Sequence, residues 1–182
     1  MKKLFFSIWE VVEVVVIAAI TVFLIRSFLI QPFVVSGASM EPNLSNKNYL
    51  LVNELVLRFR EPERGEVVVF RFPLDHTSFF IKRVIGLPGE RIISNNGKIT
   101  IETVQGKTIP LTEFYIATKR ESGSDFDILL GSNEYFVMGD NRNQSYDSRN
   151  WGAIQKNDII GVALLRIFPL ENFGFFEIPT YQ

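Results

Sequence analysis

The sequence contains no cysteine and a single histidine, His76. Without cysteine there is no disulfide framework, no thiol nucleophile and no cysteine metal site. A serine–histidine–aspartate mechanism would have to use His76, and a histidine-rich metal site is excluded. Lys and Arg number 19 against 20 Asp and Glu, so no basic excess indicates nucleic acid as a partner. We expect neither metal nor cofactor. The 182 residues have room for one domain of ordinary size and a membrane segment.

Polar residues and helix breakers are scarce near the N-terminus. The stretch Leu4–Ile30 is rich in Val, Ile, Leu and Phe, has no Gly or Pro, and is interrupted by Glu10, Glu13 and Arg26. About 20 apolar residues are needed to span a bilayer, and Val11–Ile30 supplies that length. The stretch predicts one transmembrane helix.

The charges before this helix predict its orientation. Lys2 and Lys3 place the N-terminus in the cytoplasm by the positive-inside rule. We thus expect a single-pass plasma-membrane protein, in which 1–30 form the cytoplasmic N-terminus and membrane helix and 31–182 an extracytoplasmic domain. A cleaved signal peptide and a helix lying in the interface are alternatives.

After Pro32, which is expected to end the helix, no long helical period follows. Short runs of Val, Ile and Phe between Gly and Pro turns are typical of antiparallel strands. The fold class is therefore mainly β, with a barrel-like or sandwich catalytic domain. The more polar region of approximately 95–132 is expected to be a small inserted subdomain or loop. The expected strands are Tyr49–Val52, Val67–Phe72, Phe79–Ile85, Arg91–Ser94, Lys98–Val104, Glu134–Met138 and Ile159–Arg166.

A patch of small residues, 36–39, follows the apolar segment and ends at Ser39. Gly37 and Ala38 would let a substrate backbone approach closely, and Pro42 would hold the next turn rigid. Ser39 is thus a candidate nucleophile. A small-residue linker, or a small-x-small cleavage site at the end of a signal peptide, would also explain the patch.

Lys82 lies inside a predicted strand. Side chains alternate along a strand, so Lys82 shares a face with Phe80 and Val84. Burial lowers the pKa of a lysine, and a neutral amine can take the proton of a serine hydroxyl without any histidine. The alternative is a surface lysine on an edge strand.

A third stretch, Gly139–Arg149, is dense in side chains that bond to the backbone, which predicts a structured loop. Its Ser145 could orient the amine of Lys82, and Asp147 could pair with Arg149. A polar surface turn is an alternative. A calcium loop is a weaker one, because arginines intrude and no terminal Glu closes the spacing.

Together these stretches resemble the bacterial type I signal peptidases, membrane-bound Ser-Lys endopeptidases that remove signal peptides from exported preproteins. The likeness covers almost the whole chain, with the motifs in the family's order behind the membrane helix. The matching stretches are Gln31–Phe33, Gly37–Leu44, Arg64–Phe70, Phe80–Glu90 and Gly139–Arg149.

The resemblance implies a role for each matching position. Ser39 would be the nucleophile that forms an acyl-enzyme, and Lys82 would be its general base. The supporting positions would be Ser145, which positions the lysine, the ion pair of Asp147 and Arg149, and Arg83 near that pair. Pockets for small side chains, and hence cleavage after small-x-small sites, would be formed by Phe33, Val35, Gly37, Met40, Leu44, Phe80 and Ile81.

Two positions depart from the family. Gly37 stands where some members carry a serine that completes the oxyanion hole, so the backbone N–H of Ser39 is expected as one donor, and the second, a backbone group or water, stays open. Asn43 stands where Thr is usual, and we expect this to be a mild change in a surface turn.

The resemblance also implies the partners, which are preproteins with signal peptides and the lipid bilayer, and a monomeric chain. Phe173, Phe175 and Phe176 would either touch lipid or form a C-terminal core.

Three alternatives to a general signal peptidase stay open. One is a related Ser-Lys peptidase with a dedicated substrate. Another is a membrane-anchored β domain that binds signal peptides without cleaving them. The third, a self-cleaving repressor, fits poorly because the chain has no DNA-binding domain.

Overall fold

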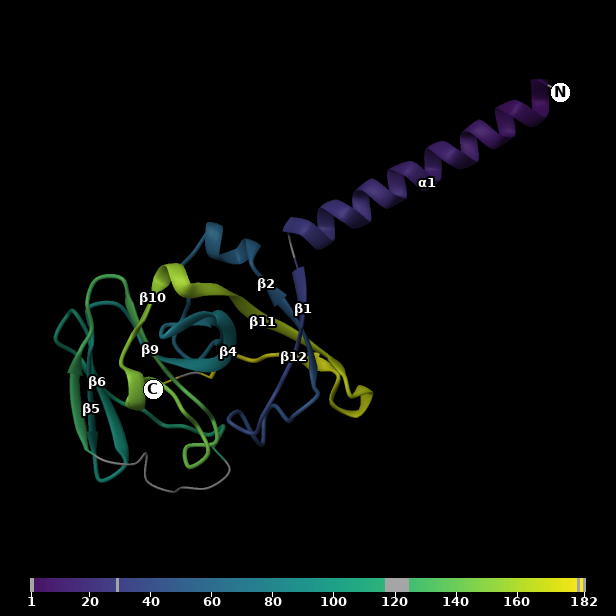
Figure 1. Ribbon diagram of the computed structural model, residues 1–182. Coiled ribbons are helices and arrows are strands. Elements are labelled where there is room, and N and C mark those ends of the chain that lie inside the picture. The colour runs from purple at the N-terminus through teal and green to yellow at the C-terminus, as the bar shows by residue number, and fades with distance from the viewer. Residues whose placement is uncertain (1, 29, 117–124, 180, 182) are drawn as a thin grey trace.

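The computed structural model describes residues 2–28, 30–116, 125–179 and 181. The fold is mainly antiparallel β, as the sequence predicts, and one long helix, α1 (Lys2–Phe28), projects away from the β body (Figure 1). The other helical elements are short: η1 (Leu55–Arg58), α2 (Ser148–Trp151), η2 (Lys156–Asp158) and η3 (Leu170–Asn172).

The described side chains of α1, at positions 9–22, are all exposed. In the part of the chain that the structure describes, no helix is both long and apolar enough to cross a bilayer, so the predicted transmembrane helix is not confirmed. The helix ends at Phe28, earlier than expected. Pro32 instead lies in β1 (Ile30–Val34), at the edge of a sheet, where proline is tolerated.

The larger sheet has eight strands in the order β1-β2-β11-β3-β4-β9-β10, and β12 pairs with β11. Among the described strands β1 does not pair with β10, so the sheet is open and the predicted barrel-like closure is not found. The strands are β2 (Tyr49–Asn53), β3 (Val67–Phe72), β4 (Asp75–Gly86), β9 (Glu134–Met138), β10 (Ile154–Gln155), β11 (Ile159–Phe168) and β12 (Gly174–Phe175).

A second sheet has the order β7-β6-β5-β8. Asn96 and Gly97 both have positive φ in the turn between β5 and β6, the hairpin conformation that an Asn-Gly pair favours. This sheet occupies much of 95–132, although 117–124 lie outside the described residues, and its status as an inserted subdomain stays a prediction. Its strands are β5 (Arg91–Asn95), β6 (Lys98–Glu102), β7 (Thr108–Pro110) and β8 (Phe126–Leu129).

Three clusters of buried apolar side chains hold these sheets together. One of them joins the second sheet to β9 through contacts such as those of Ile92, Ile101 and Phe136. Another lies beneath the turn that follows β1 and includes Met40 and Leu44, which are 1% and 0% exposed. Full burial of such a side chain contributes about 1.5–3 kcal/mol, so this cluster fixes the turn that carries Ser39.

Candidate active site

Ser39 and Lys82 meet although they are 43 positions apart, because the turn after β1 lies against β4. The Lys82 Nζ lies 2.8 Å from the Ser39 Oγ and 3.0 Å from the carbonyl oxygen of Ile81. A heavy-atom distance of about 2.6–3.2 Å is what proton transfer from a nucleophile to a base requires. The geometry suits deprotonation of Ser39 by a neutral Lys82.

The environment of Lys82 favours the neutral amine. The residue is only 4% exposed, and burial lowers the pKa of its ammonium to about 8, although the charges of Asp147 and Asp140 oppose the shift. With that pKa about one amine in ten is neutral at pH 7, against about one in three thousand for a free lysine. Lys82 is therefore a usable base near neutral pH.

The 139–149 loop holds the backbone of the turn that carries Ser39. The Asn141 backbone N–H donates to the Ser39 carbonyl at 3.0 Å, and the Asn141 Nδ2 donates to the Ala38 carbonyl at 3.1 Å. Gly139 packs so tightly that an added Cβ would lie closer than 3.0 Å to the Ser39 carbonyl oxygen and to the Ser145 Oγ. In the sequence, the one signal for Asn141 and Gly139 is their place in this polar stretch, from which no role was predicted.

Ser145 lies near the site, but it does not make the expected contact with Lys82. Its buried Oγ has no hydrogen-bond partner among the described residues, so the predicted bond to Lys82 is not seen. The hydroxyl does lie close enough to Asp147 to help lower the pKa of that carboxyl group. Ser145 thus lies beside the dyad and is not bonded to it.

The predicted ion pair of Asp147 and Arg149 is present, with 2.8 Å between Asp147 Oδ1 and Arg149 Nε. Burial would raise the pKa of Asp147, but its hydrogen bonds and ion pair with Arg149 outweigh that effect and lower the pKa. Asp147 also caps the N-terminus of α2 and accepts a 3.0 Å bond from the Gly139 N–H. One carboxylate therefore fixes both ends of the 139–149 loop.

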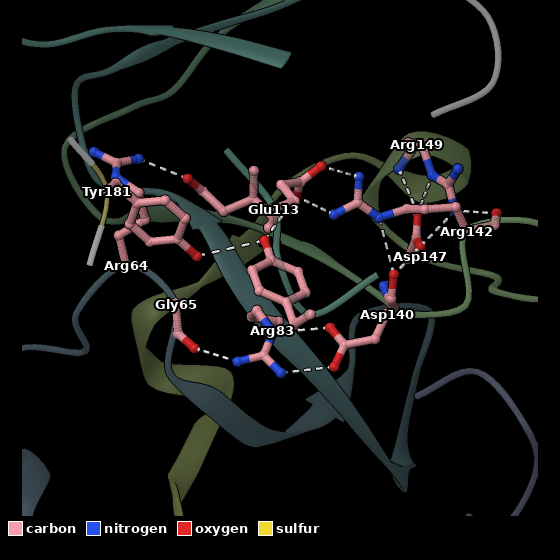
Figure 2. A network of polar contacts seen from close by, with 12 residues as sticks. Arg64, Gly65, Arg83, Glu113, Asp140, Arg142, Asp147, Arg149 and Tyr181 are labelled. Atoms are coloured by element: carbon pink, nitrogen blue, oxygen red, sulfur yellow. Dashed lines mark hydrogen bonds and ion pairs between the residues drawn. The ribbon is translucent and has the colours of Figure 1, made fainter. Parts of the chain in front are cut away.

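Arg83 belongs to a separate buried pair (Figure 2). Its Nε and Nη2 donate to the two carboxylate oxygens of Asp140 at 2.8 and 2.6 Å, and its Nη1 donates to the Gly65 carbonyl at 2.7 Å. The sequence analysis placed Arg83 near the Asp147–Arg149 pair without naming a partner, and its ion-pair partner is Asp140. Removing one member of such a pair leaves an uncompensated buried charge.

A cleft of about 590 Å³ opens beside the dyad. Five of the seven residues predicted to contact substrate line it: Phe33, Val35, Gly37, Phe80 and Ile81. The structure places the other two, Met40 and Leu44, in the core beneath the turn instead of in the cleft wall. Further lining residues that the sequence analysis did not select are Val34, Ser36, Ala38, Leu50, Val69, Ser78, Phe79, Gln144 and Tyr146.

His76 lies elsewhere, on the exposed part of β4, with its Nδ1 3.4 Å from Asp158. It does not line the cleft, so nothing in the geometry supports a histidine mechanism. Within the described residues, no group of three or more His, Cys, Asp or Glu side chains is placed to hold a metal ion.

Comparison with known proteins agrees with this geometry. The family model described as "Signal peptidase, peptidase S26" matches residues 8–168. The chain belongs to this signal peptidase family. It is therefore an enzyme, a serine endopeptidase of the hydrolase class.

Individual signal peptidases are similar over most of the chain. Signal peptidase I P of Bacillus subtilis subsp. natto is 38% identical over 175 residues, which cover 91% of each chain. Probable signal peptidase I-2 of Synechocystis is 37% identical over 174 residues, or 91% of this chain and 75% of that one. A signal peptidase I of Enterococcus faecalis with a crystal structure aligns over 57% of this chain and 97% of its own, at a TM-score of 0.47 and 28% identity.

The departure at Gly37 leaves this signal peptidase without a hydroxyl donor at that position. Gly37 has a φ of 98°, in the region that favours glycine, and its N–H donates to the Asn46 side chain at 3.2 Å. The backbone N–H of Ser39 has no acceptor among the described residues. That N–H is therefore available to a substrate carbonyl.

The departure at Asn43 is not the surface change that the sequence analysis expects. Asn43 is half-buried, and its Nδ2 donates to Asp140 Oδ2 at 2.9 Å and to the Tyr115 carbonyl at 2.7 Å. Its own carbonyl accepts a 2.6 Å bond from Arg166. In this signal peptidase, position 43 connects the turn that carries Ser39 to the rest of the polar network.

Proposed function

We propose that this protein removes signal peptides from exported preproteins, with Ser39 as nucleophile and Lys82 as general base. The observation that carries the proposal is the 2.8 Å approach of a buried lysine amine to a serine hydroxyl at the wall of a cleft. Membership of the signal peptidase family supports the same substrate class. No metal or nucleotide enters this mechanism.

The reaction runs in two halves. Neutral Lys82 takes the hydroxyl proton of Ser39, and the Oγ attacks the scissile carbonyl while the Ser39 N–H donates to the developing oxyanion. Collapse breaks the C–N bond, Lys82 returns its proton to the leaving amine of the mature protein, and the signal peptide stays esterified to Ser39. Lys82 then takes a proton from water, whose attack on the ester releases the signal peptide and restores Ser39.

Substrate would bind in an extended conformation along β4. Among the described residues β4 pairs with β9 only from Arg83 onwards, and no other strand pairs with that edge of β4 beside the cleft, where an extended substrate could add. Small side chains at the first and third positions before the cut would fill the apolar surface formed by Val35 and Ile81. This arrangement supports a small-x-small preference.

We further propose that α1 anchors a monomeric enzyme in the plasma membrane, with the N-terminus cytoplasmic and the β body outside. Support comes from the exposure of its apolar side chains, including Trp9 at 64% and Val22 at 63%, which would be unfavourable in water. Phe173 and Phe175 are also exposed and suit lipid contact, whereas Phe176 packs against the core cluster beneath the turn.

Cleavage of a model preprotein in lipid vesicles tests the proposal. We expect the wild type to cut after an Ala-x-Ala site, as read by mass spectrometry, and Ser39→Ala to produce no cut. Replacing Ala by Leu at the position before the cut should lower kcat/KM more than about tenfold, because the added side chain does not fit the shallow pocket. Equal behaviour of wild type and Ser39→Ala would reject the dyad. Cleavage of only one among several unrelated preproteins would indicate a dedicated peptidase.

The pH dependence of cleavage follows from the pKa of Lys82. Its lowered value of about 8 means that the amine is protonated, and inactive as a base, at lower pH. We expect kcat/KM to rise about tenfold per pH unit below pH 8 and to level off above it. A substrate without ionisable groups near the cut serves as the control. A flat profile between about pH 6 and pH 9.5 would exclude a titrating lysine as the base.

A further inference from the structure

A closed ring of contacts holds the turn that carries the nucleophile, and Asn43 is part of that ring. Ser39 starts the turn in which Asn43 lies four positions later, and the Leu44 N–H bonds to the Met40 carbonyl at 2.9 Å within that turn. Asn43 donates to Asp140, and the next residue, Asn141, binds the Ser39 carbonyl. The turn is therefore held at both ends by two adjacent residues of one loop.

The same carboxylate also reaches the base. Asp140, 1% exposed, accepts hydrogen bonds from Arg83 Nε and Nη2 and from the Asn43 amide. Arg83 is the neighbour of Lys82 in β4, and alternation along the strand sends the two side chains to opposite faces. A shift of Asp140 would thus move the turn of Ser39 relative to the strand of Lys82.

The chemistry of an amide suits Asn43 to this position. An asparagine NH₂ group has two donor hydrogens, and here they meet two acceptors, the Asp140 carboxylate and the Tyr115 carbonyl. Tyr115 follows β7 in the chain, so the bond reaches a third part of the chain. An isosteric aspartate would supply no donor and would place a second negative charge against Asp140.

We propose that Asn43 is a positioning residue that sets the distance between the Ser39 hydroxyl and the Lys82 amine. It touches neither the substrate cleft nor the reacting atoms, and it acts through Asp140 and Asn141. This inference rests on the proposed Ser-Lys mechanism. Because a misplacement of about 1 Å can cost a hundredfold in rate, a loosened turn should lower kcat far more than it changes KM.

The test compares Asn43→Ala, Asn43→Asp and Asn43→Thr in the full chain in vesicles, with rates divided by the folded fraction from circular dichroism. We expect kcat to fall about tenfold for Ala and more than about fiftyfold for Asp, with KM within about twofold. Thr, whose hydroxyl keeps one donor, should stay within about threefold of wild type. Asn157→Ala, at an exposed asparagine in η2, should leave kcat unchanged.

Hydrogen exchange of the 139–142 backbone provides a readout that does not depend on activity. Exchange of the Asn141 amide should accelerate in Asn43→Ala and Asn43→Asp and stay unchanged in Asn157→Ala. Asn43→Ala and Asn43→Asp variants that melt earlier yet keep wild-type kcat per folded molecule would overturn the positioning role. If the wild type cleaves no preprotein, the proposed function fails, and unchanged exchange at Asn141 would then overturn the Asn43 inference separately.

Discussion

Lys82→Arg is expected to abolish preprotein cleavage, lowering kcat/KM more than about a thousandfold. Arginine keeps the positive charge and much of the length of lysine, but its guanidinium stays protonated at any usable pH and cannot accept the Ser39 proton. The role assigned to Lys82 depends on its neutral form, which burial makes accessible by lowering its pKa to about 8. Cleavage is measured in vesicles, with products followed by gel and mass spectrometry.

Two further variants make this result interpretable. Lys82→Met removes the charge while keeping an unbranched side chain, so it should fold and be equally inactive. Lys156→Arg changes a half-exposed lysine that pairs with Glu61 away from the cleft, and it should keep activity within about twofold. Appreciable turnover in folded Lys82→Arg, or in Lys82→Met, would reject the Ser-Lys mechanism.

Gly139→Ala is expected to lower kcat more than about a hundredfold. The added methyl group would collide with the Ser39 carbonyl oxygen and with the Ser145 hydroxyl, both closer than 3.0 Å. The serine side chain can rotate, but the carbonyl belongs to the backbone of the nucleophile and is held there by Asn141. Relief of the clash must therefore shift the loop or the backbone of Ser39, and we expect either shift to disturb the approach of Ser39 to Lys82.

Gly174→Ala is the matched control, because a Cβ at that glycine would meet open space. It should leave kcat within about twofold of wild type. Circular dichroism and thermal unfolding show whether Gly139→Ala is folded, and the rate is expressed per folded molecule. A folded Gly139→Ala enzyme with wild-type kcat would mean that the tight packing between the loop and the turn has no role in catalysis.

The sequence by itself determined the features that depend on near neighbours. Runs of apolar residues in 67–72 and 134–138 predicted strands that the structure contains, and the Asn96-Gly97 pair between two predicted strands suits the hairpin that joins β5 and β6. The spacing along one strand also placed Lys82 among apolar neighbours, which left a buried and a surface position open, and the structure buries it. These signals are local, because strand alternation and turn chemistry act within a few residues.

Only the tertiary structure decided which distant residues contact one another. The sequence predicts the pair of Asp147 and Arg149, which lie two positions apart, but only the packing of β4 against the 139–149 loop gives Arg83 its partner Asp140. In the same way, the sequence marks Met40 as part of the nucleophile motif without showing that its side chain faces the core.

The position of Asn43 is a second case of this kind. A polar residue after Pro42 predicts a surface turn, yet this side chain is half-buried between Asp140 and the Tyr115 carbonyl. Its partners lie 97 and 72 positions away in the chain, and no local pattern encodes such a separation. The sequence shows which residue types can do the chemistry. Long-range packing decides which of them come into contact, because each such contact depends on how whole sheets and loops fit together.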